Sequence, residues 1–302
     1  MLVVGDEMLD ENRQIAMEGI MSKTVIITGA SGGIGAAAAR QLTRDGHEVV
    51  IVGRSPEKTR AIGDALGVPR HLADFADLSQ VRDLAGALLA AHPRIDVLAN
   101  NAGGMMGERT LTVDGFERTF QVNHLAPFLL TELLMPALTA GSATVIQTSS
   151  AAARLFARFD IDDLQNAHGY SPLRAYGNGK LANILFTEEL QRRYGDQGIS
   201  AVAFHPGVVA TGFAGETNHI LRRIYHGPLR KLFTISPEKG ADQLVWLAEG
   251  TAGESFIPGA YYESRRIATK VNPKAHDADL ARELWDRSSA MIRPFLEIHS
   301  QE

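Results

Sequence analysis

Tyr176 and Lys180 lie four residues apart in the segment Ala-Tyr-Gly-Asn-Gly-Lys, which leads into a helical pattern. This spacing places both side chains on one face of a helix. An ammonium group beside a phenol stabilises the phenolate and lowers the pKa of the tyrosine from its ordinary value of about 10. Such a tyrosine can donate or accept a proton near neutral pH. The pair is therefore a candidate acid/base site, although the same spacing also arises by chance on helix surfaces.

A glycine-rich turn near the N-terminus supplies a second candidate site. The short apolar strand pattern that starts at Thr24 runs into Thr-Gly-Ala-Ser-Gly-Gly-Ile-Gly, residues 28–35, and an alanine-rich helical pattern follows to Arg44. Glycines let the backbone turn tightly and approach a pyrophosphate, whose charge then rests at the helix N-terminus. Strand, glycine-rich turn and helix in this order predict a dinucleotide-binding turn.

Strand and helix patterns alternate along the chain, which predicts helices on both faces of a parallel sheet. The strand patterns cover Thr24–Thr28, His47–Val52, Arg70–Leu72, Ile95–Ala99, Ala143–Thr148, Ile199–Phe204 and Ala260–Tyr262. The helical patterns cover Ile34–Arg44, Pro56–Leu66, Leu78–Ala91, Phe116–Leu138, Lys180–Tyr194 and Pro237–Ala248. We therefore expect a single α/β domain, a Rossmann-type, doubly wound and mostly parallel sheet of seven strands. Ligands of such sheets bind at the carboxyl ends of the strands, where Gly29, Asn100, Ser150 and His205 fall.

These motifs together resemble the short-chain dehydrogenase/reductase family. The two patterns above correspond to its Thr-Gly-x-x-x-Gly-x-Gly and Tyr-x-x-x-Lys motifs. Four further stretches agree with the family, and the resemblance spans roughly residues 23–290. They are Asn100–Gly103, Phe120–His124, Val145–Ser150 and His205–Thr211. The stretches around 159–166, 170–176 and 180–186 are similar to the retinol-dehydrogenase and WW-domain-oxidoreductase branch of that family.

The resemblance implies hydride transfer between a nicotinamide and a carbonyl carbon. Tyr176 would donate the proton to the carbonyl oxygen or remove it in the reverse direction, and Ser150 would hydrogen-bond that oxygen. Lys180 would assist Tyr176 and bind the nicotinamide ribose, and Asn123 would hold a water that links Lys180 to solvent. Only one of the adjacent Ser149 and Ser150 can face the site from a strand end, and the family pattern favours Ser150.

The cofactor preference follows from the end of the second strand pattern, where Gly53 and Arg54 stand in place of an acidic residue. A carboxylate there would repel a 2′-phosphate and an arginine would bind it, so we expect NADP(H) rather than NAD(H). Asp74 and Phe75 resemble the adenine-side pair of the family. The full set of expected cofactor contacts is Gly29, Ser31, Gly32, Gly33, Ile34, Gly35, Arg54, Asp74, Phe75, Asn101, Ala102, Gly103, Thr148, Tyr176, Lys180, Pro206, Gly207, Val209 and Thr211.

Substrate specificity should come from residues 212–235, which are rich in large apolar side chains interleaved with arginines and a lysine. We interpret this stretch as a lid over a lipophilic substrate. A basic amphipathic helix at a membrane surface and an ordinary surface helix are the alternatives. Leu155, Phe156 and Phe159 could line the opposite wall. Retinoid, steroid, aliphatic aldehyde and polyketide-like ketone all stay open as substrates. A hydrophobic pocket discriminates between substrates that differ by a methylene by only a few kcal/mol, so residue types alone do not select one.

Composition agrees with an ordinary soluble enzyme. The chain has 302 residues, 45% of them hydrophobic, enough for a substantial core. Its net charge of −5 gives no nucleic-acid footprint, and the absence of cysteine excludes disulfides and thiolate chemistry. No apolar run reaches the length of a membrane span. We expect a cytoplasmic enzyme with a small-molecule alcohol or carbonyl substrate, no metal, and a homodimer or homotetramer as the assembly to test.

Residues 1–20 should be a flexible or helical extension outside the domain of residues 21–302. Acidic residues are scattered through them and no positive start is present, which argues against a signal peptide. Two rival functions stay open. Because Gly32 and Gly33 are both present, the turn also fits the Thr-Gly-x-x-Gly-x-x-Gly spacing of sugar-nucleotide epimerases and dehydratases. A non-catalytic NADP sensor or scaffold could also use this fold, but it would not need all four of Ser150, Tyr176, Lys180 and Asn123.

Overall fold

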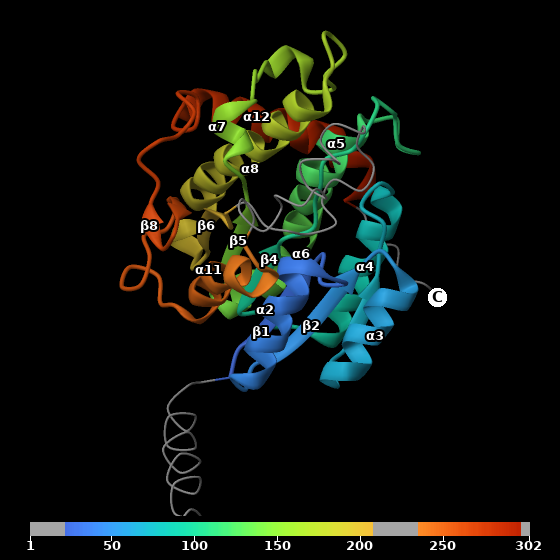
Figure 1. Ribbon diagram of the computed structural model, residues 1–302, viewed down its shortest axis with the longest axis vertical. Coiled ribbons are helices and arrows are strands. Elements are labelled where there is room, and N and C mark those ends of the chain that lie inside the picture. Colours follow the sequence, from blue (N-terminus) through green and yellow to red (C-terminus); the bar gives the residue numbers. More distant parts are fainter. Residues whose placement is uncertain (1–21, 208–234, 297–302) are drawn as a thin grey trace, which may run out of the picture.

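A computed structural model of the chain describes residues 22–207 and 235–296. One sheet lies between two layers of helices (Figure 1). The strand order is β3-β2-β1-β4-β5-β6-β7-β8, and every neighbouring pair is parallel except β7 and β8. The chain order reverses between β1 and β4, the point at which open α/β sheets form their binding crevice. The predicted doubly wound α/β fold is confirmed.

The sheet has one strand more than the sequence predicted. The strands are β1 (Thr24–Thr28), β2 (Glu48–Gly53), β3 (Arg70–Leu72), β4 (Val97–Asn100), β5 (Thr144–Thr148), β6 (Ser200–His205), β7 (Tyr261–Glu263) and β8 (Arg266–Ile267). The expected number of seven was wrong because β8 is a two-residue, exposed strand that follows a tight turn at Ser264 and Arg265, both with positive φ. Such a strand carries no apolar pattern that a sequence reading could detect.

Alternate residues of each strand pack on opposite faces of the sheet. Val25 and Ile27 of β1 belong to the core beneath α2 (Gly33–Arg44), α3 (Pro56–Leu66) and α11 (Pro237–Glu249). Ile26 faces the other core, which includes α4 (Leu78–Ala91), α6 (Ala126–Gly141), α8 (Pro172–Tyr194) and α12 (Ala278–Ile292). This burial on both faces explains why the strands read as continuous apolar runs.

Short helical turns complete the framework. They are α5 (Arg118–Phe120), α7 (Ala152–Leu155), the π-helix η1 (Gln121–Leu125), and the 3₁₀ turns η2 (Ile161–Asp163), η3 (Gly195–Gln197) and η5 (Arg293–Phe295). The predicted single helix Phe116–Leu138 is therefore interrupted, because α5 leads into the π-helix before α6 begins. π-Turns of this kind are frequent at functional sites, and this one carries Asn123.

Three expectations fall outside the part of the chain that the structure describes. They are the extension of residues 1–20, the lid of residues 212–235 apart from Ile235, and the cofactor contacts of Val209 and Thr211. Among the described residues, no helix is both long enough and apolar enough to cross a membrane.

Candidate active site

A cavity of about 750 Å³ opens along the carboxyl ends of β1, β2, β3, β4, β5 and β6. It runs from the glycine-rich turn at one end to the tyrosine of α8 at the other. The predicted site residues that line it are Gly29, Ser31, Gly32, Gly33, Ile34, Arg54, Asp74, Phe75, Asn101, Ala102, Gly103, Thr148, Ser150, Tyr176, Lys180, Pro206 and Gly207. Residues from opposite ends of the sequence thus meet in one space, because parallel strands bring their ends to one edge of the sheet.

Tyr176 and Lys180 project from the same face of α8. The helix begins at Pro172, and the Ser171 side chain accepts a hydrogen bond from the backbone N–H of Arg174 at its N-terminus. The ammonium of Lys180 lies 5.5 Å from the centroid of the Tyr176 ring. Its Nζ also donates to the backbone oxygen of Thr148 at 2.9 Å. Burial removes the water that would solvate this ammonium and lowers the pKa of Lys180 to about 7.

The two serines at the end of β5 have different environments. Ser149 is buried, and its hydroxyl donates to the backbone oxygen of Lys180 at 2.7 Å, which ties β5 to α8. Ser150 is partly exposed, and its Oγ accepts a hydrogen bond from the backbone N–H of Ala152 at 3.2 Å. An oxygen that already accepts a bond keeps its own proton to donate. Ser150 is therefore the serine able to donate to a ligand in the cavity.

Asn123 does not line the cavity, unlike the other three predicted catalytic residues. Its amide nitrogen donates to the backbone oxygens of Gly104 and Thr119, both at 2.8 Å, and its Oδ1 accepts from the N–H of Gly104 at 3.1 Å. A Cβ built on Gly103 would lie 2.6 Å from Asn123 Oδ1 and 3.1 Å from Lys180 Nζ. The two side chains thus approach the same point beside Gly103, and a water link between Asn123 and Lys180 stays a prediction.

The glycines of the turn serve different purposes. Gly29 and Gly33 have φ of 67° and 55°, which favour glycine. A Cβ on Gly35 would lie 2.7 Å from the oxygen of Gly29, so Gly35 lets the helix pack against the turn rather than line the cavity. A Cβ on Gly32 would meet nothing within 4 Å. The backbone therefore needs Gly33, as in Thr-Gly-x-x-x-Gly-x-Gly, and does not need Gly32 of the epimerase-type spacing.

The end of the cavity farthest from Tyr176, beside the glycine-rich turn, is lined by polar and charged side chains. Arg54 and Lys58 lie there beside Ser31, at the end of β2. Asp74 and Phe75 follow β3, as predicted, but the Asp74 carboxylate also accepts a hydrogen bond from the N–H of Ala76 at 3.0 Å. The aspartate is thus a turn former as well as a candidate contact.

The end near Tyr176 is apolar, and its residues were mostly missed from the sequence. Met105 and Ala152 pack with Tyr176 in one small buried cluster, with Leu173 against it. Met106 and Val122 also line the cavity. Nothing in their sequence separates these residues from ordinary core positions. Leu155 and Phe156 lie at the mouth with exposed fractions of 53% and 40%. Both belong to the wall expected from the sequence and line the cavity, whereas Phe159, the third residue of that wall, is buried in the core.

Comparison with known proteins identifies the family. The family model described as short chain dehydrogenase matches residues 23–221, which include the glycine-rich turn, the serines and the Tyr176–Lys180 pair. The chain belongs to the short-chain dehydrogenase family. A short-chain dehydrogenase is an oxidoreductase, so this protein is an enzyme of that class acting on a small molecule, and the scaffold and epimerase alternatives lose their support.

Two curated relatives place this short-chain dehydrogenase in the retinol-dehydrogenase-like branch. A Streptomyces protein named "Putative daunorubicin C-13 ketoreductase DnrU" is 44% identical over 281 residues, covering 91% of this chain and 94% of the relative. Human retinol dehydrogenase 13 is 36% identical over 286 residues, covering 90% and 85%. A crystal structure of a metagenomic short-chain oxidoreductase in complex with NADP matches with a TM-score of 0.58 and 27% identity, covering 79% of this chain and 96% of that one. The relatives interconvert alcohols and carbonyls by name, in line with oxidoreduction at such a group.

Proposed function

We propose that the protein is an NADP(H)-dependent oxidoreductase that interconverts an alcohol and a carbonyl group on a small lipophilic substrate. The observation that carries this proposal is one continuous cavity with the glycine-rich turn at one end and Ser150, Tyr176 and Lys180 at the other. A dinucleotide laid across the sheet at the point where the strand order reverses would occupy this cavity.

The residues at the turn fit a dinucleotide. Helix α2 has no side-chain cap and no acidic residue in its first turn, whereas α3, α4, α8, α11 and α12 are all capped by a serine or an aspartate. No side chain therefore caps the N-terminal N–H groups of α2, and a pyrophosphate would accept hydrogen bonds from them. Arg54 and Lys58 would bind a 2′-phosphate at the far end. The structural relative with bound NADP supports this choice.

The bound nicotinamide supplies or accepts the hydride. The Ser150 hydroxyl would hydrogen-bond the substrate oxygen and stabilise the charge that develops there. Tyr176 would transfer the proton at that oxygen, and the ammonium of Lys180 would favour the phenolate. Asn123 would connect Lys180 to solvent through a water. The buried position of Lys180 strengthens its influence on Tyr176 because little water screens it.

The substrate class follows from the apolar end of the cavity. Met105, Ala152 and Leu173 surround Tyr176 with hydrocarbon and thioether groups, and Leu155 and Phe156 extend this surface to the mouth. Adaptable methionines suit a bulky apolar substrate. The names of the relatives support a ketone on a fused ring system or a retinoid aldehyde, and we place the ketone first because the ketoreductase is the more similar of the two.

The test is NADPH oxidation by the purified protein across anthracycline-type ketones, retinal, steroid ketones and aliphatic aldehydes, with NADH in parallel. We expect turnover with at least one lipophilic carbonyl and a preference for NADPH. Tight NADPH binding without turnover on any substrate would instead favour a cofactor sensor.

The adjacent serines provide a matched control. Ser150→Ala should lower kcat by about 10² to 10³-fold, as loss of one donor to a developing oxyanion does. Ser149→Ala should mainly lower the melting temperature, because it removes bonds of a buried hydroxyl to the backbone of α8 and to Tyr261. Equal kinetic losses in the two variants would contradict the role given to Ser150.

A further inference from the structure

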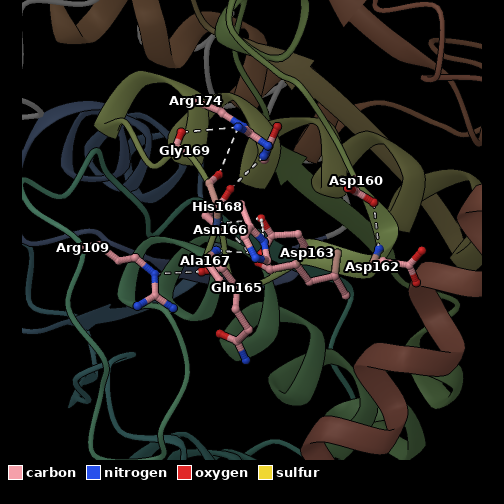
Figure 2. Close-up of polar contacts among 12 residues, drawn as sticks. Arg109, Asp160, Asp162, Asp163, Gln165, Asn166, Ala167, His168, Gly169 and Arg174 are labelled. Carbon is pink, nitrogen blue, oxygen red and sulfur yellow. Dashed lines mark hydrogen bonds and ion pairs between the residues drawn. The ribbon is translucent and has the colours of Figure 1, made fainter.

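The segment between α7 and α8 folds into a compact polar structure beside the N-terminus of α8 (Figure 2). The Asp163 carboxylate accepts hydrogen bonds from the N–H groups of Ala167 at 2.6 Å and His168 at 3.1 Å. Nη1 of Arg174, in the first turn of α8, donates to the backbone oxygens of His168 and Gly169. The segment is thus fixed both to itself and to the helix that carries Tyr176.

A buried chain of hydrogen bonds runs through this segment from one helix to another. The N–H of Arg158 donates to Oδ1 of Asn178 at 2.8 Å, and Nδ2 of Asn178 donates to Oδ1 of Asn166 at 2.8 Å. Nδ2 of Asn166 then donates to Oε2 of Glu117 at 3.2 Å. All three residues are buried: the exposed fraction is 0% for Glu117, 2% for Asn166 and 6% for Asn178.

The chain of hydrogen bonds has one direction. Both carboxyl oxygens of Glu117 accept hydrogen bonds, so Asn166 must present its amide nitrogen to Glu117 and its oxygen to Asn178. Asn178 must then present its nitrogen to Asn166 and its oxygen to the N–H of Arg158. Neither amide can rotate by 180° without placing two acceptors or two donors face to face, which is costly in a buried site.

Two members of this chain, the terminal Glu117 and the internal Asn178, lie on the elements that carry the proposed catalytic residues. Glu117 caps α5 by accepting from the N–H groups of Thr119 at 2.7 Å and Phe120 at 2.9 Å, and α5 continues into the π-helix of Asn123. Asn178 lies on α8 between Tyr176 and Lys180. Asn166 therefore joins the start of one catalytic element directly to the middle of the other.

Gln165 makes a second connection between this segment and the start of α5. Its Oε1 accepts from the N–H of Glu117 at 2.6 Å, and its backbone oxygen accepts from Nε of Arg109 at 3.3 Å, a contact visible in Figure 2. Asn166 itself has a φ of 48°, a conformation that residues other than glycine seldom adopt. The local backbone is thus held in an unfavourable region in a residue whose side chain bonds to both helices.

We propose that Asn166 is a positioning residue that sets the distance between the π-helix of Asn123 and the Tyr176–Lys180 face of α8. This proposal rests on the proposed function for its kinetic consequences. Loss of the Asn166 side chain should loosen the two elements relative to each other, and misplacement of reacting groups by about 1 Å can cost about 10²-fold in rate. Residues 158–170 are then a brace for the catalytic groups rather than an inert insertion.

The test uses Asn166→Gly, which removes both side-chain bonds while easing the positive φ. Its matched control is Ser142→Gly, an exposed residue with φ of 49° at the opposite end of β5. We expect kcat of Asn166→Gly to fall about ten- to a hundredfold while the NADPH dissociation constant stays unchanged. Water entering beside Lys180 would relieve the desolvation of its ammonium and raise its pKa. The pH at half-maximal kcat/KM should therefore also move upward. Kinetics equal to those of Ser142→Gly would overturn the proposal.

A double-mutant cycle separates this role from loss of packing. Asn178→Ala removes the same chain from the α8 side and introduces a strong helix former. If the chain acts as one unit, Asn166→Gly combined with Asn178→Ala should slow turnover no more than either single change. Multiplied losses would overturn the proposal.

Amide hydrogen exchange on the cofactor-free protein keeps this proposal separate from the proposed function. Exchange should accelerate in residues 118–125 and 172–180 of Asn166→Gly and not of Ser142→Gly. Unchanged exchange would overturn the brace. An inactive wild type with accelerated exchange in the variant would refute the carbonyl chemistry and leave the brace standing.

Discussion

Burial of the Lys180 ammonium lowers the free energy of unfolding, and this effect can be measured. Its ammonium is buried, and burial alone lowers its pKa to about 7 from 10.5. Below about pH 7 the folded and unfolded states both carry the charge, and the folded state bears the full desolvation cost. Between pH 7 and 10.5 the unfolded state binds a proton that the folded state does not, so stability rises with pH over that range.

Lys180→Met should therefore be more stable than the wild type at low pH, when both lack cofactor. The difference in melting temperature between the two should be largest below about pH 7 and shrink as the pH rises towards about 10.5. Thermal unfolding of both proteins across this range measures it. A difference that does not change with pH would show that Lys180 does not titrate there.

Single residues also show where reasoning from sequence stops. The types and spacing of Tyr176 and Lys180 predicted that both would face one cavity, and they do. Asn123 was predicted to hold a water for Lys180; its amide nitrogen donates to the backbone oxygens of Gly104 and Thr119, and the role in a water link stays a prediction. Hydrogen-bond partners depend on loop conformation, which a residue pattern does not specify.

Most strand and helix positions followed from apolar periodicity, because the central strands β1, β2, β4, β5 and β6 are buried on both faces and helices such as α3 and α12 on one. Helices α3 and α4 have the predicted bounds. The π-turn was not predictable, because its residues are all buried and share one apolar pattern with α6. The start of α8 at Pro172, earlier than Lys180, follows from the Ser171 cap and was missed.

The glycine-rich turn gives a matched prediction at this scale. Gly35→Ala should lower stability by about 1–3 kcal/mol, because its Cβ would lie 2.7 Å from the oxygen of Gly29 and 2.8 Å from Nδ2 of Asn101. Gly32→Ala should change stability by less than about 0.5 kcal/mol, since its Cβ meets nothing, yet weaken NADPH binding by filling space beside the phosphates. Denaturant unfolding and NADPH titration of both variants measure this. Equal stability losses would contradict the distinction.

Helices α6 and α8 bury long stretches of their length within this one chain. Residues 121–131 of η1 and α6 and residues 175–187 of α8 are all buried within one chain. Helix α12 supplies much of the cover, since the Trp285 ring lies 4.9 Å from that of Phe128 and 5.6 Å from that of Phe186, between ring centroids. Pairing through these helices would require α12 to leave, exposing a large apolar surface.

We therefore expect a monomer, in contrast to the homodimer or homotetramer that the family resemblance left to be tested. Light scattering coupled to size-exclusion chromatography should give a mass near 32.7 kDa. A dimeric or tetrameric mass would show that another surface pairs or that α12 moves aside.

A single-turnover reduction, with NADPH already bound to wild type or Tyr176→Phe, tests directly whether Tyr176 is the acid/base. We predict that the variant binds NADPH with unchanged affinity and loses at least about 10²-fold in the rate of NADPH oxidation, because it lacks the proton that the substrate oxygen needs. An undiminished rate in Tyr176→Phe would contradict the assignment of Tyr176 as the acid/base.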